Sequence, residues 1–335
     1  MTAQVREGAA RLATRLLDTA PMRRLLARRP ASTAVLMYHG VVPDGTRPGL
    51  WTQLERSAFA AQMRYLADHR PVISVPELVD GLQGRRSLPD HAVAITFDDG
   101  YFNVLDQALP ELERFGLPAT LFMTAGHFTG DLAPHQLLWF DQIYDAHGDQ
   151  LVLGFADTVY RRTRTLKRMP EETRRQVVAH LYGAGFSTMP AGADHPWRLM
   201  TLDELKSLAA SPLMTIGAHS LTHGLLTRMP QAQARDEISR SRQVLQSLLQ
   251  QPIDTFAFPD GALDETVTQL VRQAGFRAAF STRPGAVAQG DDRFTLRRFP
   301  VGQDTSLDRF ALILQGLDEV LASLQSRPRW KELYG

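Results

Sequence analysis

Short apolar runs alternate with amphipathic segments along most of this chain, and this alternation restricts the fold more than any other feature. The apolar runs span residues 34–40, 93–97, 119–123, 215–218, 256–258 and 278–281. Between them, hydrophobic residues recur at the three- and four-residue spacing of helices that bury one face. This order of strands and helices favours a parallel sheet covered by helices. The functional side chains of such a sheet lie at the carboxyl ends of its strands.

Three sequence patterns mark the starts of helices. Ser74 precedes Glu77 by three positions, and Thr201 is followed by an acid at the same spacing. In a capping box the hydroxyl accepts a hydrogen bond from the first turn, and the carboxylate bonds back to the cap. We therefore predict that one helix begins directly after Ser74 and another directly after Thr201. By the same pattern, Thr305 is expected to cap a C-terminal helix at about 306–325.

The composition indicates one globular enzyme. A chain of 335 residues with a formal net charge of +1 gives no reason to expect a nucleic-acid partner. The absence of cysteine excludes disulfides and thiolate metal sites. We expect one domain over residues 32–335, preceded by a distinct segment at 1–31.

Two acidic residues stand together where the apolar run 93–97 ends. Asp98 and Asp99 are followed by Gly100, which lets the backbone turn away at once. Neighbouring carboxylates repel each other, and they are costly to bury without a positive partner. A metal ion is the obvious candidate for that partner.

Two histidines follow the apolar run 215–218. His219 and His223 are four residues apart, a spacing that lets both meet one ion on a helical turn or a curled loop. Either motif alone is a weak signal, because an Asp-Asp-Gly triplet is usually a turn and a lone histidine pair is usually a coincidence. Together they supply one oxygen and two nitrogen ligands, with room for water. This is the composition of a hydrolytic metal site.

The two motifs together resemble a known family. Thr96-Phe97-Asp98-Asp99-Gly100 followed by His219-Ser220-x-x-His223 is similar to the first two motifs of the polysaccharide deacetylases, the NodB homology domain of carbohydrate esterase family 4. The resemblance extends from about Ala34 to Val301. It implies an α/β fold, a distorted (β/α) barrel with a helical insertion.

The resemblance also implies roles for the motif residues. Asp98 would be the catalytic base that activates water, and Asp99, His219 and His223 would hold a divalent metal ion. Zinc fits this ligand set best, while nickel, cobalt and iron are alternatives. Adjacent strand residues point to opposite sides, so the two aspartates can differ in role only if the backbone curls after Phe97.

The third family motif departs from its usual Arg-x-Pro-aromatic-Gly form. It reads Ala257-Phe258-Pro259-Asp260-Gly261, so Ala257 replaces an arginine that orients the catalytic aspartate in relatives. Either Arg297 or Arg298 could take over this role, or the base is tuned differently. The residues expected to contact substrate are Tyr38, Pro259, Asp260, Gly261, Arg297 and Arg298.

The general acid of the family has no clear match in the later part of the chain. The segment Leu36-Met37-Tyr38-His39-Gly40-Val41 resembles the first strand of the subgroup that acts on poly-N-acetylglucosamine-like exopolysaccharides. His39 is therefore our candidate for the acid. A structural histidine at the mouth of the barrel is the alternative.

Residues 128–200 interrupt the alternation and are interpreted as a helical insertion. Its basic run, from Arg161 to Arg168, is either a solvated helix face or a rim that contacts an anionic substrate.

Residues 1–31 contain seven arginines and two acidic residues, and their hydrophobic residues recur at helical spacing and form an apolar stripe. They are either a helix packed on the domain or a contact with anionic membrane. The segment lacks the continuous apolar region of a signal peptide, and no apolar run is long enough to span a bilayer, so we expect a cytoplasmic protein. The membrane alternative would place it at the inner face of the cell membrane.

The sequence thus predicts a metal-dependent hydrolase. Its expected substrate is an acylated amino sugar of a polysaccharide or a lipid-linked saccharide. An O-acetyl carbohydrate esterase on the same scaffold is one alternative, because metal and base serve esters equally well. A carbohydrate-binding pseudoenzyme is the other.

Overall fold

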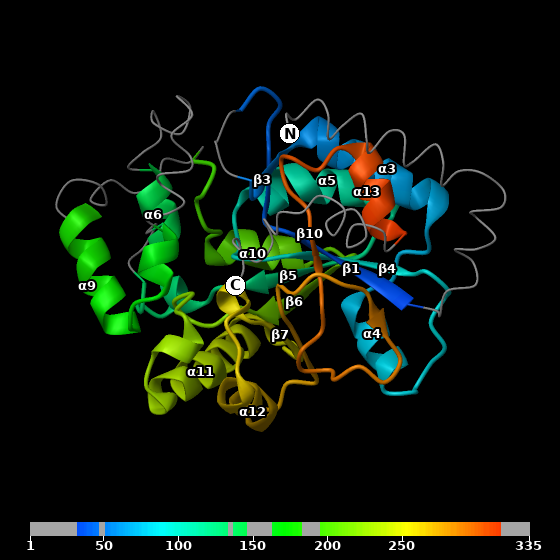
Figure 1. The fold of residues 1–335 in the computed structure, drawn as a ribbon. Coiled ribbons are helices and arrows are strands. Elements are labelled where there is room, and N and C mark those ends of the chain that lie inside the picture. Colours follow the sequence, from blue (N-terminus) through cyan, green and yellow to red (C-terminus); the bar gives the residue numbers. More distant parts are fainter. Residues whose placement is uncertain (1–31, 47–50, 133–136, 146–162, 183–194, 316–335) are drawn as a thin grey trace, which may run out of the picture.

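A curled parallel sheet forms the centre of the molecule (Figure 1). The structure, a computed structural model, describes residues 32–46, 51–132, 137–145, 163–182 and 195–315. The strand order is β10-β1-β4-β5-β6-β7-β8. The strands of this path are β1 (Ser32–Tyr38), β4 (Val93–Phe97), β5 (Ala119–Met123), β6 (Met214–Ala218), β7 (Thr255–Ala257), β8 (Ala278–Phe280) and β10 (Phe299–Pro300).

The two edges of this sheet are joined by the segment that leads into β10. Leu296 forms a parallel bridge with Phe280 of β8, and Phe299 pairs in parallel with Leu36 of β1. The short strand β9 (Val287–Ala288) adds an antiparallel pair at the start of β1. The sheet therefore curls into the expected distorted (β/α) barrel. Outside it, β2 (Gly40–Val42) and β3 (Gln53–Glu55) form a separate two-stranded sheet.

The strand register brings the carboxyl ends of the central strands to one edge. Tyr38 pairs with Phe97 at the ends of β1 and β4, and Met123 pairs with Ala218 at the ends of β5 and β6. The next residue of each chain segment therefore emerges at the same rim. This is why residues far apart in the sequence can form one site.

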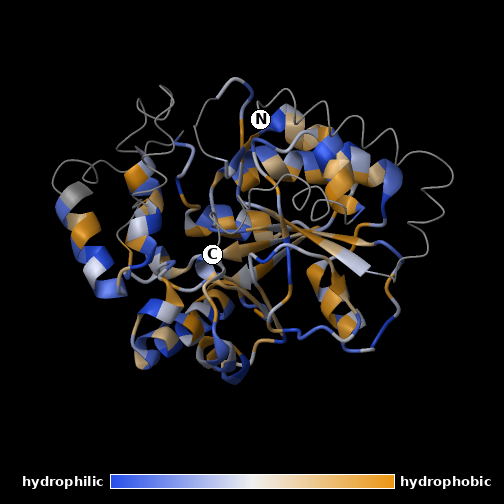
Figure 2. Ribbon diagram, viewed as in Figure 1, coloured by the Kyte–Doolittle hydropathy of each residue, from blue (hydrophilic) through white to orange (hydrophobic). Residues whose placement is uncertain are grey.

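Helices cover the outside of the curled sheet, and the strands carry most of the continuous hydrophobic colour (Figure 2). Outside the insertion, the described α-helices are α3 (Arg56–His69), α4 (Val75–Leu82), α5 (Leu109–Phe115), α10 (Leu202–Ala209), α11 (Gln231–Leu249), α12 (Glu265–Gln273) and α13 (Leu307–Leu314). The short turns are the π-helical η1 (Val104–Ala108) and the 3-10 helices η2 (Gly126–Phe128), η3 (Leu226–Arg228) and η4 (Pro259–Gly261).

Two of the three predicted helix caps are confirmed. Ser74 and Thr201 each form a complete capping box with the glutamate three positions later. The cap predicted at Thr305 is wrong, because α13 begins one residue later and its cap is Ser306. The Thr305 hydroxyl instead accepts a hydrogen bond from the Gly302 N–H at 3.2 Å. The C-terminal helix is described to Leu314, and the rest of the predicted range 306–325 lies outside the described residues after 315.

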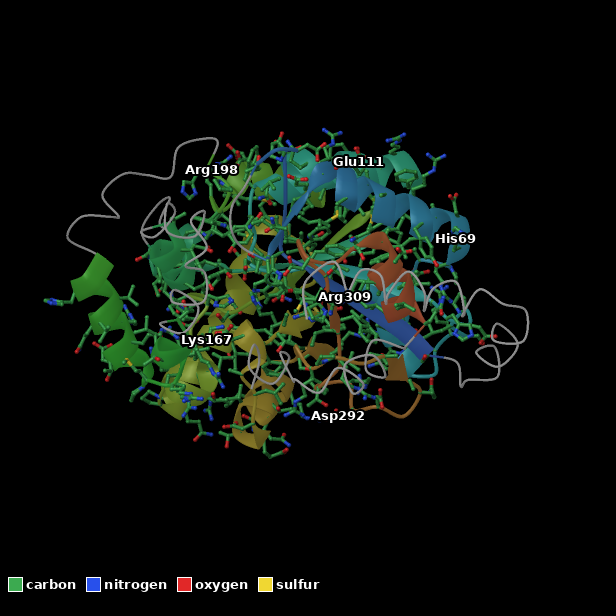
Figure 3. All side chains as sticks on the ribbon, turned by 45° about the horizontal axis from the view of Figure 1, so that its top comes forward. His69, Glu111, Lys167, Arg198, Asp292 and Arg309 are labelled. Atoms are coloured by element: carbon green, nitrogen blue, oxygen red, sulfur yellow. The ribbon has the colours of Figure 1, made fainter. Side chains whose placement is uncertain are left out.

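The insertion packs on a small hydrophobic cluster of its own, beside the barrel. Its described helices are α6 (Trp139–Asp145), residues 163–167 and α9 (Glu171–Tyr182). Lys167 lies on this side of the molecule and His69 on the other (Figure 3). We call the cluster the insertion core; its buried members are Tyr101, Leu138, Trp139, Ile143, Tyr144, Leu166, Val178, Trp197 and Leu199.

The predicted basic segment at 1–31 lies outside the described residues. Among the residues that the structure describes, no helix is both long enough and apolar enough to cross a membrane.

Candidate active site

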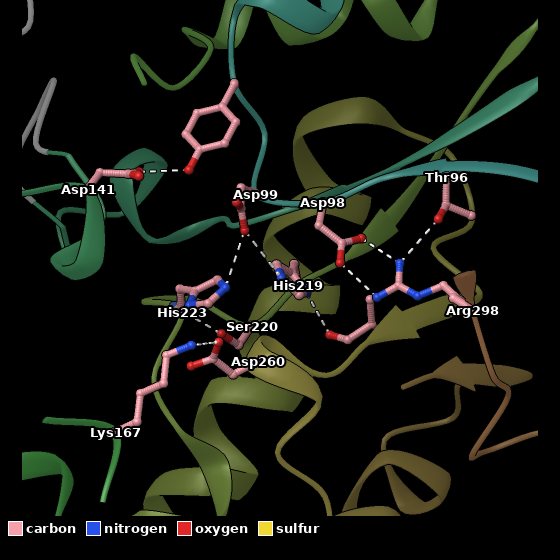
Figure 4. Close-up of polar contacts among 12 residues, drawn as sticks. Thr96, Asp98, Asp99, Asp141, Lys167, His219, Ser220, His223, Asp260 and Arg298 are labelled. Atoms are coloured by element: carbon pink, nitrogen blue, oxygen red, sulfur yellow. Dashed lines mark hydrogen bonds and ion pairs between the residues drawn. The ribbon is translucent and has the colours of Figure 1, made fainter. Parts of the chain in front are cut away.

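The backbone curls directly after β4, as the two aspartates require. Asp99 has a positive φ of 74°, and Gly100 follows with a φ of 102°. This φ strains any residue with a side chain, and a Cβ on Gly100 would also collide with the sulfur of Met123, so the turn needs glycine. As a result Asp98 and Asp99 extend toward different partners (Figure 4).

Asp99 meets the two motif histidines. Its Oδ1 atom lies 3.5 Å from Nε2 of His219 and 3.2 Å from Nε2 of His223. One ligand atom from each residue can be chosen so that all three lie within 4.8 Å of one another. All three side chains are buried. The structure therefore brings together the residues that the two sequence motifs single out.

The donor chemistry of this cluster fits a metal ion. Nδ1 of His219 lies 2.8 Å from the Ala257 carbonyl oxygen, which can only accept, so Nδ1 carries the proton and Nε2 presents a lone pair. Both carboxylate oxygens of Asp99 are buried, and neither has a hydrogen-bond partner among the described residues. Acceptors that face one another in this way are satisfied by a cation.

The electrostatics of the cluster also favour positive charge. Burial raises the pKa of Asp99, but His219 and His223 outweigh it and hold that pKa well below its ordinary value. Burial lowers the pKa of His219, but Asp98 and Asp99 outweigh it and raise that pKa. The two shifts have one cause, which is the attraction between the negative carboxylates and positive charge at the histidines.

A buried glutamate holds the turn between the two histidines. Glu237 of α11 accepts hydrogen bonds from the Leu221 and Thr222 N–H groups, both at 2.9 Å, and from the Thr222 hydroxyl at 2.6 Å. The Ser220 hydroxyl accepts from the His223 N–H at 3.1 Å. The hydroxyls of Ser220 and Thr222 therefore support the site.

Arg298 forms a bidentate ion pair with Asp98. The guanidinium nitrogens lie 2.6 and 2.7 Å from the two carboxylate oxygens, and Arg298 also donates to the Ser281 carbonyl and the Thr96 hydroxyl. Burial raises the pKa of Asp98, but Arg298 and His219 outweigh it and lower the pKa. Asp98 is therefore a fixed, ionised carboxylate.

Ala257 stands where relatives have an arginine that orients the catalytic aspartate. In this structure Arg298 makes that contact with Asp98, and Arg297 does not. The side chain of Arg297 is 45% exposed and lies 3.5 Å from a carboxylate oxygen of Asp291. Neighbouring residues of an extended segment point to opposite sides, and only Arg298 faces the inside of the barrel.

These residues open into a cavity of about 440 Å³. His39, Asp260 and Gly261 line it together with Asp98, Asp99 and the two motif histidines. His39 packs edge-on against Trp51, with ring centroids 5.2 Å apart. Burial lowers the pKa of His39, although Asp99 and Asp98 oppose the shift. Its Nδ1 atom is buried and has no hydrogen-bond partner among the described residues.

Four of the residues expected to contact substrate are not among those that line this cavity: Tyr38, Pro259, Arg297 and Arg298. Tyr38 is fully buried, packs on Phe59 and Phe97, and donates its hydroxyl to Gln62 at 2.8 Å. As the last residue of β1 it points to the opposite side from His39, into the space under α3. Pro259 is also buried and begins η4.

The rest of the cavity wall comes from residues that the sequence motifs do not identify. The insertion contributes Phe140, Tyr144, Thr163, Arg164, Lys167 and Arg168. Lys167 pairs with Asp260, and Glu171 of α9 accepts a hydrogen bond from the Leu225 N–H at 3.0 Å. Described residues of the basic run line the cavity, and their contact with an anionic substrate stays a prediction.

The comparisons with known proteins agree with this geometry. The family model "Polysaccharide deacetylase" matches residues 85–279. YxkH of Bacillus subtilis, a protein named for the polysaccharide deacetylases, is 20% identical over 290 residues, which cover 86% of this chain and 78% of YxkH. The poly-beta-1,6-N-acetyl-D-glucosamine N-deacetylase of Escherichia coli is 28% identical over 126 residues, 36% of this chain and 18% of that enzyme.

Solved structures show the same fold. The deacetylase PplD of Streptococcus pyogenes superposes with a TM-score of 0.59 at 16% identity, over 85% of this chain and 99% of PplD. IcaB from Ammonifex degensii gives a TM-score of 0.58 at 22% identity, over 85% of this chain and 98% of IcaB. With the motif residues gathered at one rim of this barrel, the chain belongs to the polysaccharide deacetylase family, the hydrolases that act on amide bonds of carbohydrates.

Proposed function

We propose that this chain is a metal-dependent deacetylase that removes an N-acyl group from an amino sugar of a polysaccharide or a lipid-linked saccharide. Among N-acyl groups, N-acetyl is the one we propose. The observation that carries the proposal is the buried cluster of Asp99, His219 and His223 beside the arginine-bound Asp98. The similarity to an N-acetylglucosamine polymer deacetylase of Escherichia coli supports the sugar class.

Asp99 and the Nε2 atoms of His219 and His223 would hold the ion. Zinc suits one carboxylate and two imidazoles, and nickel, cobalt and iron accept the same donors. When bound, such an ion polarises the acyl carbonyl and lowers the pKa of a water molecule. The buried turn held by Glu237 keeps the two histidines in place for this role.

The remaining steps belong to the side chains around the cluster. Asp98 accepts the proton of the attacking water, and Arg298 keeps its carboxylate ionised and oriented. As the C–N bond breaks, the leaving nitrogen must gain a proton. His39 lines the same cavity and is our candidate donor. Burial lowers the pKa of His39 while Asp99 and Asp98 favour its protonated form, and as the acid it must hold a proton before the C–N bond breaks.

Acetate release from matched sugars tests the proposal. The full chain is treated with a chelator, reloaded with zinc, and assayed on an N-acetylglucosamine oligosaccharide and on an O-acetylated sugar. We expect acetate from the N-acetyl substrate, lost with the metal and restored by zinc. Undiminished turnover after metal removal, or release from the O-acetyl sugar alone, would contradict the proposal.

A substitution at His39 tests its place in the reaction. His39→Gln should slow hydrolysis of the amide far more than that of an activated ester, whose leaving group needs little protonation. Equal losses on both substrates would assign His39 a structural role against Trp51.

A further inference from the structure

A basic face of the insertion lines the cavity. Arg164 and Lys167 lie in the helical residues 163–167, and Arg168 follows directly. Lys167 and Arg168 come three and four residues after Arg164, so the three side chains share one side of that turn. Leu166 is buried in the insertion core on another side. Arg228, at the end of η3, adds a fourth basic residue to the cavity wall. A helix face that served only solubility would turn to bulk water, whereas this one borders the candidate active site.

The acidic residues of the cavity already have partners. Asp98 is bound by Arg298, and Asp260 is bound by Lys167. Asp99 faces the two histidines. The negative charge on the cavity floor is therefore balanced without the other basic residues of the wall.

Three guanidinium groups of the wall are left without a counter-charge. Within the part of the chain that the structure describes, Arg164, Arg168 and Arg228 form no ion pair with a carboxylate. Like charges four residues apart on a helix repel each other. An anion bound between these side chains would remove that repulsion.

Arg164 also has an unused hydrogen-bond donor. Its side chain is partly buried, and its Nε atom is buried without a partner among the described residues. A buried donor without an acceptor is unfavourable, and a charged acceptor satisfies it best. This observation points to a ligand independently of the charge balance.

The other walls of the cavity suit a sugar. Trp51, Phe140 and Tyr144 contribute aromatic surface, and Thr52, Thr227 and Thr282 contribute hydroxyl side chains. A volume of about 440 Å³ lies within the usual range for small-molecule sites. The basic face therefore borders a space that can hold a saccharide.

We infer that this chain recognises an acylated amino sugar that carries an anionic group, a phosphate or a carboxylate, on the same or a neighbouring sugar, and that Arg164 and Arg168 bind that group. The planar guanidinium matches the paired oxygens of either anion and stays charged at any working pH. The inference rests on the proposed function, because it names the substrate class of the same site.

Calorimetric binding to the zinc-loaded full chain tests the inference. The probes are a neutral N-acetylglucosamine tetramer, N-acetylglucosamine 1-phosphate, a hyaluronan tetrasaccharide with its carboxylates, and inorganic phosphate alone. We expect at least one anionic sugar to bind about tenfold more tightly than the neutral tetramer, with an affinity that falls as salt rises. The phosphate-bearing and carboxylate-bearing probes then separate the two sources of the anion.

A charge-matched pair of variants assigns the effect to the wall. The double variant Arg164→Gln, Arg168→Gln should lose the preference for the anionic sugar and keep its affinity for the neutral one. The control Arg64→Gln, Arg235→Gln removes the same charge from exposed residues that do not line the cavity, and it should keep the preference.

Other results would overturn the inference. Equal affinity for neutral and anionic sugars, or an equal loss of both in the double variant, contradicts it. Inorganic phosphate that binds as tightly as the sugar phosphate also contradicts it, because saccharide recognition is then absent. Anionic preference without acetate release from any sugar contradicts the proposed function instead and leaves anionic recognition supported.

Discussion

The two walls of the cavity are built in different ways. The strand-end wall carries Asp98, Asp99 and His219, which lie one or two residues after central strands whose backbones are paired on both sides. The insertion wall carries Arg164 and Lys167 on a short helical turn that rests on the separate insertion core. In the proposed reaction, the strand-end wall holds the reacting groups in fixed positions, while the insertion wall meets the substrate beyond the acyl group. Reaction and substrate choice should therefore respond to different substitutions.

The largest expected effect comes from removing a metal ligand in the strand-end wall. His223→Ala takes away one of three donors, so bound metal should disappear and acetate release should fall below detection. Metal content by atomic emission, measured beside activity, checks this prediction. Full metal occupancy in the variant would contradict the assignment of His223 as a metal ligand.

The next largest effect separates base from ligand within the same wall. Asp98→Asn keeps the shape of the side chain but removes the proton acceptor, so kcat should fall by about 10²-fold or more. Metal should stay bound, because Asp98 faces Arg298 and not the histidines. If Asp98→Asn loses metal while Asp99→Asn retains it, the two roles are reversed.

A smaller effect is expected from the support behind the histidines. Glu237→Gln leaves only one acceptor oxygen for a turn that uses both, so the affinity for zinc should weaken by about 10- to 100-fold. Excess zinc should then restore most of the turnover. The control is Asp236→Asn, which removes an acid from the exposed neighbouring position. An unchanged zinc affinity in Glu237→Gln would show that the turn keeps its shape without the hydrogen bonds to the Glu237 carboxylate.

The sequence predicts the strand-end wall well because its information is local. Each motif follows an apolar strand and so lies at the rim, and the family resemblance assigns Asp99, His219 and His223 to the metal. The structure brings these three residues together. The alternation of strand side chains also explains two details that the motifs leave open. It turns Arg298 inward and Arg297 outward, and it turns Tyr38 away from the cavity that its neighbour His39 lines.

The insertion wall could not be predicted in the same way. The contact between Lys167 and Asp260 joins residues 93 positions apart, and no local pattern encodes it. The basic run was visible, but its direction depends on how Leu166 packs in the insertion core. The misplaced cap of α13 has a similar cause at short range, since Thr305 and Ser306 are adjacent hydroxyl residues and only the helix start decides between them.

The smallest effect on chemistry is expected from a substitution that loosens the insertion wall alone. Leu166 is 5% exposed in the insertion core, and truncating a buried leucine to alanine costs about 2–5 kcal/mol of packing. Leu166→Ala should therefore displace the basic face and raise KM for an anionic saccharide several-fold. Its kcat on a small activated ester and its metal content should stay near those of the unaltered protein, because every metal ligand lies on the strand-end wall and its following turn. Leu307→Ala, at an exposed leucine of α13, is the matched control and should leave KM, kcat and metal content unchanged. If Leu166→Ala lowers metal content and kcat as much as it raises KM, the insertion core also supports the ligands, and the two walls are one mechanical unit joined through Glu171 and the Leu225 N–H.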